Sequence, residues 1–380
     1  MSSWPDARRI AYAAATPLRP VELPLHLAVG AVLAKPLLAL CPLPAADTSA
    51  MDGWAVHGPG PWQVVGRVLA GDPPVRVLEV GQAVEIATGA CVPAGAQGVL
   101  RYEDGHAGRQ LTGPHPAGRN VRHTGEECAA GEQVLPVGAT LTAIAVGLAA
   151  ALGHDTLLVH RRPRVAALIT GSELLRTGLP GSGRVRDALG PVLPAAVTAW
   201  GGELAGTTHV PDNRSDLLLA VRDADADVLL TSGASSVGPA DHLIAVLAQL
   251  GAQVLIDGVD VKPGHPQLLA RLADGRLLVG LPGNPLAALS GLVTLAAPLL
   301  AALSGRPLPP LGSALLGSPL DAVAGHRLVP VRLEGGWAWP TGHEGAAMLR
   351  GAALAQAFAV VEPACSLAAG DPVALAALPL

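Results

Sequence analysis

Three segments in the second half of the sequence combine residue types that can bind and transform an anion. They read VLLTSGASSVGPADHL from residue 228, VKPGHPQLLARL from residue 261 and LVGLPGNPLAAL from residue 278. Each begins as an apolar strand and runs into glycine, serine or proline, and the first and third then enter a helix pattern. Such loops direct backbone N–H groups at an anion beyond the carboxyl edge of a parallel sheet.

Lysine usage points to the second of these segments. The chain has only two lysines, Lys35 and Lys262, against 23 arginines, so its composition disfavours lysine. Lys262 begins a constrained Lys-Pro-Gly-His-Pro turn with apolar flanks. An ammonium group there suits phosphate or another oxyanion, and a plain surface lysine is less expected in so lysine-poor a chain. We therefore interpret Lys262 as an oxyanion ligand.

The loops at residues 231–238 and 281–285 are predicted to supply further contacts. Small residues at 231–238 let the backbone approach a ligand, although an ordinary strand-to-helix turn has the same composition. Residues 281–285 are more specific, because two prolines fix a rigid turn and the second suits a first helical turn. Asp241, near the next helix start, either complements the helix dipole or holds Mg²⁺ or a nucleoside hydroxyl.

Acidic residues follow or lie near predicted strand ends at Glu173, Asp187 and Asp212. Carboxylates beside phosphate-binding loops indicate Mg²⁺ and hydrolysis of a phosphate ester. Each one alone is more often a solvated loop residue, so the prediction depends on their clustering. The histidines have no paired metal spacing, and no Ser/His/Asp set stands out.

Turn-like segments in the first half carry further candidates. Asp52 lies in a run of small and polar residues that is unusual for a plain hairpin, and Thr88 and Glu127 lie in similar segments. Each of them is either a simple turn or part of a binding loop. The four cysteines are widely separated without a CxxC pair, which predicts neither a zinc site nor a disulfide framework. A reducing cytoplasm is the simplest location for such a chain.

Apolar patterning places the anion-binding loops on a doubly wound α/β sheet. Strands are predicted at residues 165–169, 228–230 and 277–280, and helices at 192–200, 240–250 and 286–303. Strands that alternate with helices indicate a parallel sheet. Residues 286–303 are uncharged and long enough to span a membrane, but Ser290, Thr294 and Pro298 within them favour a buried helix.

A chain of 380 residues exceeds one compact core, so two to four domains are expected. We predict a linking domain (1–40 plus 134–158), an inserted β-rich domain (41–133), a central α/β domain (159–305) and a small C-terminal β domain (306–380). A net charge of −5 without a basic run argues against nucleic acid and membrane as partners. The N-terminus lacks the apolar core of a signal peptide, which also favours the cytoplasm.

Seven segments, in order along the chain, carry a resemblance to a known family. They are AADTSAMDGWAV (45–56), ATGACVPAGAQGVL (87–100), NVRHTGEE (120–127), TGSELL (170–175), LLTSGASSVGPADHL (229–243), VKPGHP (261–266) and GLPGNPLAAL (280–289). Together they resemble the molybdopterin molybdenumtransferase family, which includes bacterial MoeA and the gephyrin E domain. One such match would be weak, but seven in the same order and spacing are specific.

The resemblance implies an α/β and β multidomain transferase that inserts molybdate into adenylylated molybdopterin and releases AMP by Mg²⁺-dependent hydrolysis. It further implies a homodimer with an active cleft shared between subunits, and molybdopterin adenylyltransferase as the pathway partner. Catalytic roles then fall to Asp52, Glu173, Asp241 and Lys262, with Glu173 and Asp241 as magnesium ligands. Substrate-binding roles fall to Thr88, Glu127, Asp212, Ser232, Gly233, Ser235, His265, Pro282, Gly283, Asn284 and Pro285.

Several residues depart from the family pattern. His265 stands where a second lysine is usual, and Ser172, Arg186, Ala234 and Ala287 replace an aspartate, a tyrosine, a glycine and a serine. Because a histidine is fully charged only below its pKa of about 6.5, oxyanion affinity should be weaker at neutral pH than with two lysines. These departures leave open a non-catalytic molybdopterin-binding paralogue that acts as carrier or scaffold, and a different phosphoanhydride hydrolase on the same fold.

Overall fold

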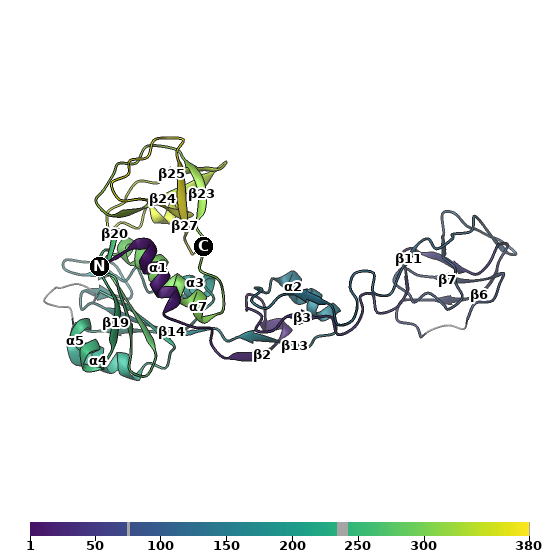
Figure 1. The fold of residues 1–380 in the computed structure, drawn as a ribbon, viewed down its shortest axis with the longest axis horizontal. Coiled ribbons are helices and arrows are strands. Elements are labelled where there is room, and N and C mark those ends of the chain that lie inside the picture. Colours follow the sequence, from purple (N-terminus) through teal and green to yellow (C-terminus); the bar gives the residue numbers. More distant parts are fainter. Residues whose placement is uncertain (74–76, 234–241, 380) are drawn as a thin grey trace. The chain divides into compact units, whose positions relative to one another are not determined.

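The computed structural model describes residues 1–73, 77–233 and 242–379, which form two compact units (Figure 1). The first unit contains Met1–Val21, Gly30–Ala34 and Val159–Leu380, and the second contains Glu22–Val29 and Lys35–Leu158. The second unit therefore interrupts the first along the chain. The finer division into four domains stays a prediction.

A six-stranded sheet in the order β17-β14-β18-β22-β21-β19 is the centre of the first unit. Its strands are β14 (Arg164–Thr170), β17 (Glu203–Val210), β18 (Val228–Ser232), β19 (Gln253–Asp257), β21 (Leu268–Arg271) and β22 (Leu277–Leu281). The neighbours β17, β14, β18 and β22 are parallel, as predicted. Strand β21 is antiparallel to both of its neighbours, β22 and β19. The short turn between β21 and β22 can join only an antiparallel pair. The sheet is therefore mixed rather than purely parallel.

Helices cover both faces of this sheet. One face packs against α1 (Trp4–Ala13), α3 (Leu193–Ala199) and the helical segment after β22. The other face packs against α4 (Arg214–Asp223) and α5 (Leu243–Gln249), which lie side by side in Figure 1. Along β14, Ala167 and Ile169 enter the first core and Leu168 enters the second, since side chains alternate across a strand. This doubly wound arrangement leaves the carboxyl ends of the parallel strands free for a site.

The apolar segment Pro285–Leu303 is a core helix in three pieces. Helices α6 (Pro285–Gly291) and α7 (Ala297–Leu303) flank a π-helical turn, η2 (Leu292–Ala296). The π turn ends two residues before Pro298, which has no N–H to bond the carbonyl four residues earlier. Among the described helices, only this segment is long and apolar enough to cross a membrane. Its apolar window is completely buried in the fold, as predicted for a core helix.

Burial of this helix makes a specific prediction about stability. Leu299 is fully buried, so Leu299→Ala should lower the free energy of unfolding by about 2–5 kcal/mol, because it removes contacts and leaves a cavity. The matched control is Leu219→Ala on α4, whose side chain is 45% exposed and whose loss should cost less than about 1 kcal/mol. Urea unfolding followed by circular dichroism measures both. Equal costs would contradict a core position for the helix.

A seven-stranded sheet in the order β1-β20-β24-β25-β23-β27-β26 forms the second layer of the first unit. Its strands are β1 (Ser2–Ser3), β20 (Val259–Lys262), β23 (Gly312–Leu316), β24 (His326–Glu334), β25 (Trp337–Pro340), β26 (Ala357–Val361) and β27 (Pro372–Ala377). Because β24 also pairs with β26, the five strands β23 to β27 close on themselves around their own core. The sheet also recruits β20 and β1 from outside the C-terminal region, which sequence analysis did not predict.

Short elements complete the first unit and its borders. They are β2 (Pro20–Pro24), which pairs with β13 (Thr156–His160), β15 (Leu174–Leu175), which pairs with β16 (Val185–Arg186), and the turn η3 (Ala352–Leu354). The β15–β16 pair holds the long loop after β14 in a defined shape, and this loop forms a wall of the site described below.

The second unit is β-rich, as its short apolar runs predicted. Its main sheet has the order β6-β7-β5-β8, made of β5 (Gly53–Val56), β6 (Gln63–Val68), β7 (Gln82–Ile86) and β8 (Val99–Arg101). Shorter pairs are β3 (Leu37–Leu38) with β12 (Gln133–Leu135), β4 (Thr48–Ser49) with β11 (Val121–Arg122), and β9 (His106–Ala107) with β10 (Leu111–Thr112). The helical elements are η1 (Leu25–Leu27) and α2 (Ala143–Ala151). Separate apolar clusters pack on the two faces of the main sheet.

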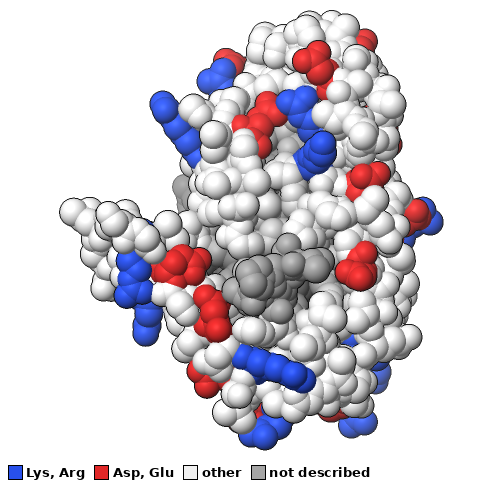
Figure 2. All heavy atoms as spheres, turned by 90° about the vertical axis from the view of Figure 1, so that its left-hand side faces the viewer, with Lys and Arg blue, Asp and Glu red and all other residues white. Residues whose placement is uncertain are grey.

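Charges of both signs are mixed on the face of the molecule that Figure 2 shows. Lys and Arg side chains lie among Asp and Glu side chains on a mostly uncharged surface. Opposite charges placed in this way partly cancel each other's field at a distance.

Candidate active site

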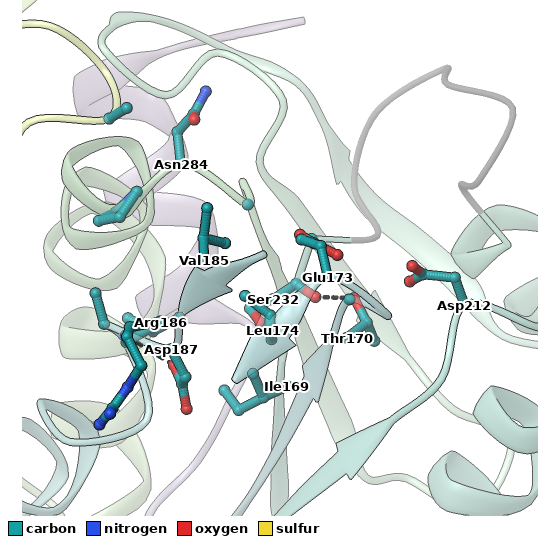
Figure 3. A pocket seen from close by; sticks show the side chains of 17 residues that line it. Ile169, Thr170, Glu173, Leu174, Val185, Arg186, Asp187, Asp212, Ser232 and Asn284 are labelled. Atoms are coloured by element: carbon teal, nitrogen blue, oxygen red, sulfur yellow. Dashed lines mark hydrogen bonds between the residues drawn. The ribbon is translucent and has the colours of Figure 1, made fainter. Parts of the chain in front are cut away.

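A cavity of about 580 Å³ lies at the carboxyl ends of β14, β18 and β22 (Figure 3). The strand ends are in register, with Ile169 opposite Ser232 and Ser232 opposite Leu281. The described lining includes a group of the predicted site residues: Glu173, Asp212, Ser232, Gly233, Gly283, Asn284 and Pro285. The topology thus gathers these loops at one edge of the sheet. Their roles in binding and catalysis stay predictions.

Bare backbone forms part of the cavity wall. Gly233 has a φ of +82°, and a Cβ there would lie 2.9 Å from the Thr170 hydroxyl oxygen. A Cβ on Gly283 would lie 3.3 Å from the Cα of Gly233, so these two loops touch. The Gly233 N–H donates to the Leu281 carbonyl at 3.1 Å, which holds the two loops together. Glycine at both positions therefore lets the backbone, and a ligand beside it, approach closely.

The beginning of α6 differs from the expectation of a free anion-binding helix end. The N–H groups of Leu286 and Ala287 donate to the Ala346 carbonyl, at 2.9 and 3.2 Å. These first-turn donors are thus satisfied by the C-terminal region of the chain. The Pro-Gly-Asn-Pro turn shapes the cavity through Gly283, Asn284 and Pro285, but these two N–H groups do not point freely at a ligand.

Asp212, which lines the cavity, and Ser172 hold each other in place. The Ser172 N–H donates to Oδ2 of Asp212 at 2.7 Å, and the Asp212 N–H donates to the Ser172 hydroxyl at 3.2 Å. The loops after β14 and β17 are therefore joined, and the serine that departs from the family pattern takes part in the contact. Glu173 follows directly, and in Figure 3 its carboxylate lies on the same side of the cavity as that of Asp212.

A buried carboxylate, Asp187, fixes the opposite wall. Its Oδ1 accepts the N–H groups of Leu189 and Gly190 at 3.0 and 2.8 Å, and its Oδ2 lies 3.1 Å from Nε2 of His209. A Cβ on Gly190 would lie 2.3 Å from Oδ2, so glycine is required there. Sequence analysis did not identify His209. Its position near the carboxyl end of β17 is the one signal that could have found it.

The cavity is mainly negative among its described residues. Glu173, Asp187 and Asp212 line it, and Arg186 is the one cationic residue in that described lining. Carboxylate oxygens suit Mg²⁺, which needs only one or two of them beside waters and substrate phosphates. No group of three or more His, Cys, Asp or Glu residues close enough to hold a metal occurs in the described part of the chain. Asp241, the other predicted magnesium ligand, and Ser235 lie outside the described residues.

Lys262 lies in a second cavity of about 280 Å³. Strands β20 and β24 are parallel neighbours, and Lys262 is the register partner of Arg327. The cavity is lined by Lys262, Pro263, Val323, Arg327, Leu328 and Glu344. Arg327 and Glu344 form an ion pair. Sequence analysis missed both, because nothing in the local sequence shows that β24 pairs with β20.

His265 and Pro282 are not brought to these cavities. Nδ1 of His265 lies 2.9 Å from the Val259 carbonyl, and its ring lies beside Gly258, at the beginning of β20. Neither His265 nor Pro282 contributes to the described lining of either cavity. The histidine at position 265, where the family usually has lysine, therefore contacts the backbone of its own loop and does not line either cavity.

Asp52 and Thr88 meet in the second unit. Oδ1 of Asp52 accepts the Thr88 N–H at 2.7 Å and the Thr88 hydroxyl at 3.1 Å. Tyr102 is adjacent, since its N–H donates to the Asp52 carbonyl. The Tyr102 hydroxyl donates to Glu85 at 2.7 Å, and this hydrogen bond raises the pKa of Tyr102 to about 12. Tyr102 is therefore protonated at neutral pH. No hydrogen bond between described residues joins Glu127 to this pair.

Comparisons with known families cover most of the chain. Residues 2–153 match the MoeA N-terminal region (domain I and II). Residues 166–302 match a probable molybdopterin binding domain, and residues 320–378 match the MoeA C-terminal region (domain IV). The first two matches contain the seven motifs, and the third lies beyond the last motif, in the C-terminal region.

Individual relatives agree with these matches. The chain is 34% identical over 353 residues to molybdopterin molybdenumtransferase 2 of Mycobacterium tuberculosis, covering 86% of both chains. It is 34% identical over 296 residues to the molybdopterin molybdenumtransferase of Synechococcus elongatus, covering 73% of each. A crystal structure of a molybdopterin biosynthesis MoeA protein from Pyrococcus superposes with a TM-score of 0.83 at 26% identity, over 100% of this chain and 99% of that one. The chain therefore belongs to the MoeA family of molybdopterin molybdenumtransferases, enzymes of molybdenum cofactor biosynthesis.

Proposed function

We propose that the protein inserts molybdate into adenylylated molybdopterin and hydrolyses the phosphoanhydride to release AMP. The observation that carries this proposal is the pair of cavities in the first unit. One is rich in carboxylates and bare backbone, and the other holds Lys262 and Arg327. Both flank the segment 344–347, because Glu344 lines one cavity and Ala347 lines the other. This arrangement suits a ligand with a nucleotide at one end and an oxyanion at the other.

The residues divide between binding and positioning. Lys262 and Arg327 attract molybdate before reaction, so that little reorganisation is needed when charge shifts. Glu173 and Asp241 are the proposed ligands of Mg²⁺, which when bound neutralises phosphate charge and lowers the pKa of a coordinated water. Asp212 fixes the loop that carries Glu173, through its bonds with Ser172. The lack of side chains at Gly233 and Gly283 lets the substrate approach the protein backbone closely.

The assembly proposed is a cytoplasmic homodimer, supplied with substrate by molybdopterin adenylyltransferase. In it, Asp52 and Thr88 of one subunit face the Lys262 cavity of the other. The proposal is supported by the exposure of Asp52 and Thr88, which are hydrogen-bonded to each other at the surface of the second unit.

The decisive experiment combines purified protein with adenylylated molybdopterin, Mg²⁺ and molybdate. We expect AMP release together with formation of a cofactor that activates a molybdenum-free apoenzyme. Tight binding of the pterin nucleotide without either product would instead identify a carrier or scaffold. AMP release without cofactor formation would identify a phosphoanhydride hydrolase of another kind.

The Asp52–Thr88 contact gives a second test of this function. Thr88→Val removes the hydroxyl donor and should lower the rate of AMP release by about tenfold, the value of a hydrogen bond to a charged acceptor. Thr88→Ser keeps a hydroxyl and is the matched control, with a rate close to wild type. The rate of AMP release in a single turnover distinguishes the valine variant from the serine variant. A valine variant as fast as the serine variant would show that the hydroxyl has no role in the reaction.

A further inference from the structure

Two cations from neighbouring strands face the same cavity. In the parallel β20–β24 pair, Lys262 and Arg327 are register partners, so their side chains leave the sheet on the same side. Both line the cavity of about 280 Å³, together with the carboxylate of Glu344 and three apolar residues. The formal charge of this lining is therefore +1 rather than +2.

Glu344 accepts a hydrogen bond from one of the N–H groups of Arg327. The Nη2 of Arg327 donates to Oε2 of Glu344, and Nη1 donates to the Asp321 carbonyl at 3.3 Å. The two side chains are only 24% and 27% exposed, so water and salt screen this pair less than they screen a surface pair. A guanidinium has five N–H donors, and the remaining ones can still face an anion.

We propose that Glu344 is a built-in counter-anion that competes with the incoming oxyanion for Arg327 and so sets the affinity of the cavity. The proposal rests on the function proposed above, in which this cavity takes molybdate. A tetrahedral dianion and the Glu344 carboxylate are both attracted to the Arg327 guanidinium, and they repel each other in a partly shielded cavity. Glu344 therefore makes the cavity selective, because only an anion that displaces or outweighs the carboxylate is retained.

The proposal predicts a gain of affinity when the carboxylate is removed. Glu344→Gln keeps the length of the side chain and removes its charge, so the full-length protein should bind molybdate at least about tenfold more tightly than wild type. Isothermal titration calorimetry with molybdate alone, without pterin nucleotide, measures this affinity. The matched control is Glu334→Gln, which removes an equal charge from an exposed ion pair with Arg332 on the same strand and should leave the affinity unchanged.

Two further variants make the test decisive. In the double variant Glu344→Gln, Arg327→Gln the gain should disappear, because the site of competition is gone. If Glu344→Gln lowers the melting temperature markedly, Glu344→Ala takes its place in the same titration. Unchanged or weaker molybdate binding by a folded Glu344 variant would overturn the proposal and make Glu344 a positioning residue for Arg327. A double variant that still binds molybdate more tightly than wild type would also overturn the proposal. These titrations do not involve AMP release, so their failure is distinct from failure of the proposed reaction.

Discussion

Replacing Lys262 with methionine should lower the rate of AMP release by about 10²- to 10³-fold, the effect of removing one preorganised electrostatic contact to a reacting anion. Methionine keeps the apolar stem of the side chain and removes the ammonium group, while Arg327 and Glu344 stay in the cavity. The charge of the described lining then falls from +1 to zero, so molybdate loses its main attraction. Steady-state assays over a range of molybdate concentrations should show a raised KM for molybdate together with a lowered kcat.

The chain supplies a matched control for this change. Lys35 is the other lysine of the sequence, and it is exposed in the second unit. Lys35→Met removes the same group and the same net charge, so it should keep wild-type activity. If Lys262→Met retained wild-type AMP release, Lys262 would not act on the oxyanion, and the proposed role of its cavity would fail.

Mixed dimers should recover activity that each parent variant lacks. We expect Asp52→Ala and Lys262→Ala each to be nearly inactive, because in the proposed homodimer each removes one side of a shared cleft. After random subunit exchange about half of the dimers are mixed, and each mixed dimer has one intact cleft, so about a quarter of wild-type activity should return. AMP release before and after exchange measures the recovery.

The controls for this prediction concern exchange itself. Differently tagged subunits, captured on one tag and detected by the other, establish the fraction of mixed dimers. A mixture of Lys262→Ala with Glu173→Ala provides the comparison, since both residues belong to the first unit. That mixture leaves no intact cleft on the shared-cleft proposal, so it should stay inactive. Recovery in neither mixture, with exchange demonstrated, would place all the catalytic residues of one cleft in a single chain.

Local sequence patterns were sufficient to predict the strand ends that form the site and the buried helix. Apolar strands that end in small residues correctly placed Ser232, Gly233 and Gly283 at one sheet edge. The uncharged segment around Pro298 was correctly interpreted as a core helix. Its π turn was not predicted, because that irregularity is an accommodation to proline within a fully packed helix.

Long-range pairing decided the parts that sequence analysis missed. Lys262 was identified from its rarity, but its neighbour Arg327 depends on the pairing of β20 with β24. The N–H groups at the start of α6 were expected to be free, and the Ala346 carbonyl from a distant loop accepts them instead. His209, on β17, contacts Asp187, which follows β16, although the two residues are 22 positions apart in the sequence. Such contacts arise from topology, and periodicity and motif spacing carry no information on them.

The pairing of β20 with β1 and β24 has a consequence for the synthesis of this protein. Ser2–Ser3 at the beginning of the chain, Val259–Lys262 in its middle and His326–Glu334 near its end meet in one sheet. While the nascent chain leaves the ribosome, β20 has one open edge until the final strands emerge, and an open strand edge invites pairing with other chains. Lys262 thus acquires its final surroundings only when translation is almost finished, which makes chaperone protection most valuable at that late stage.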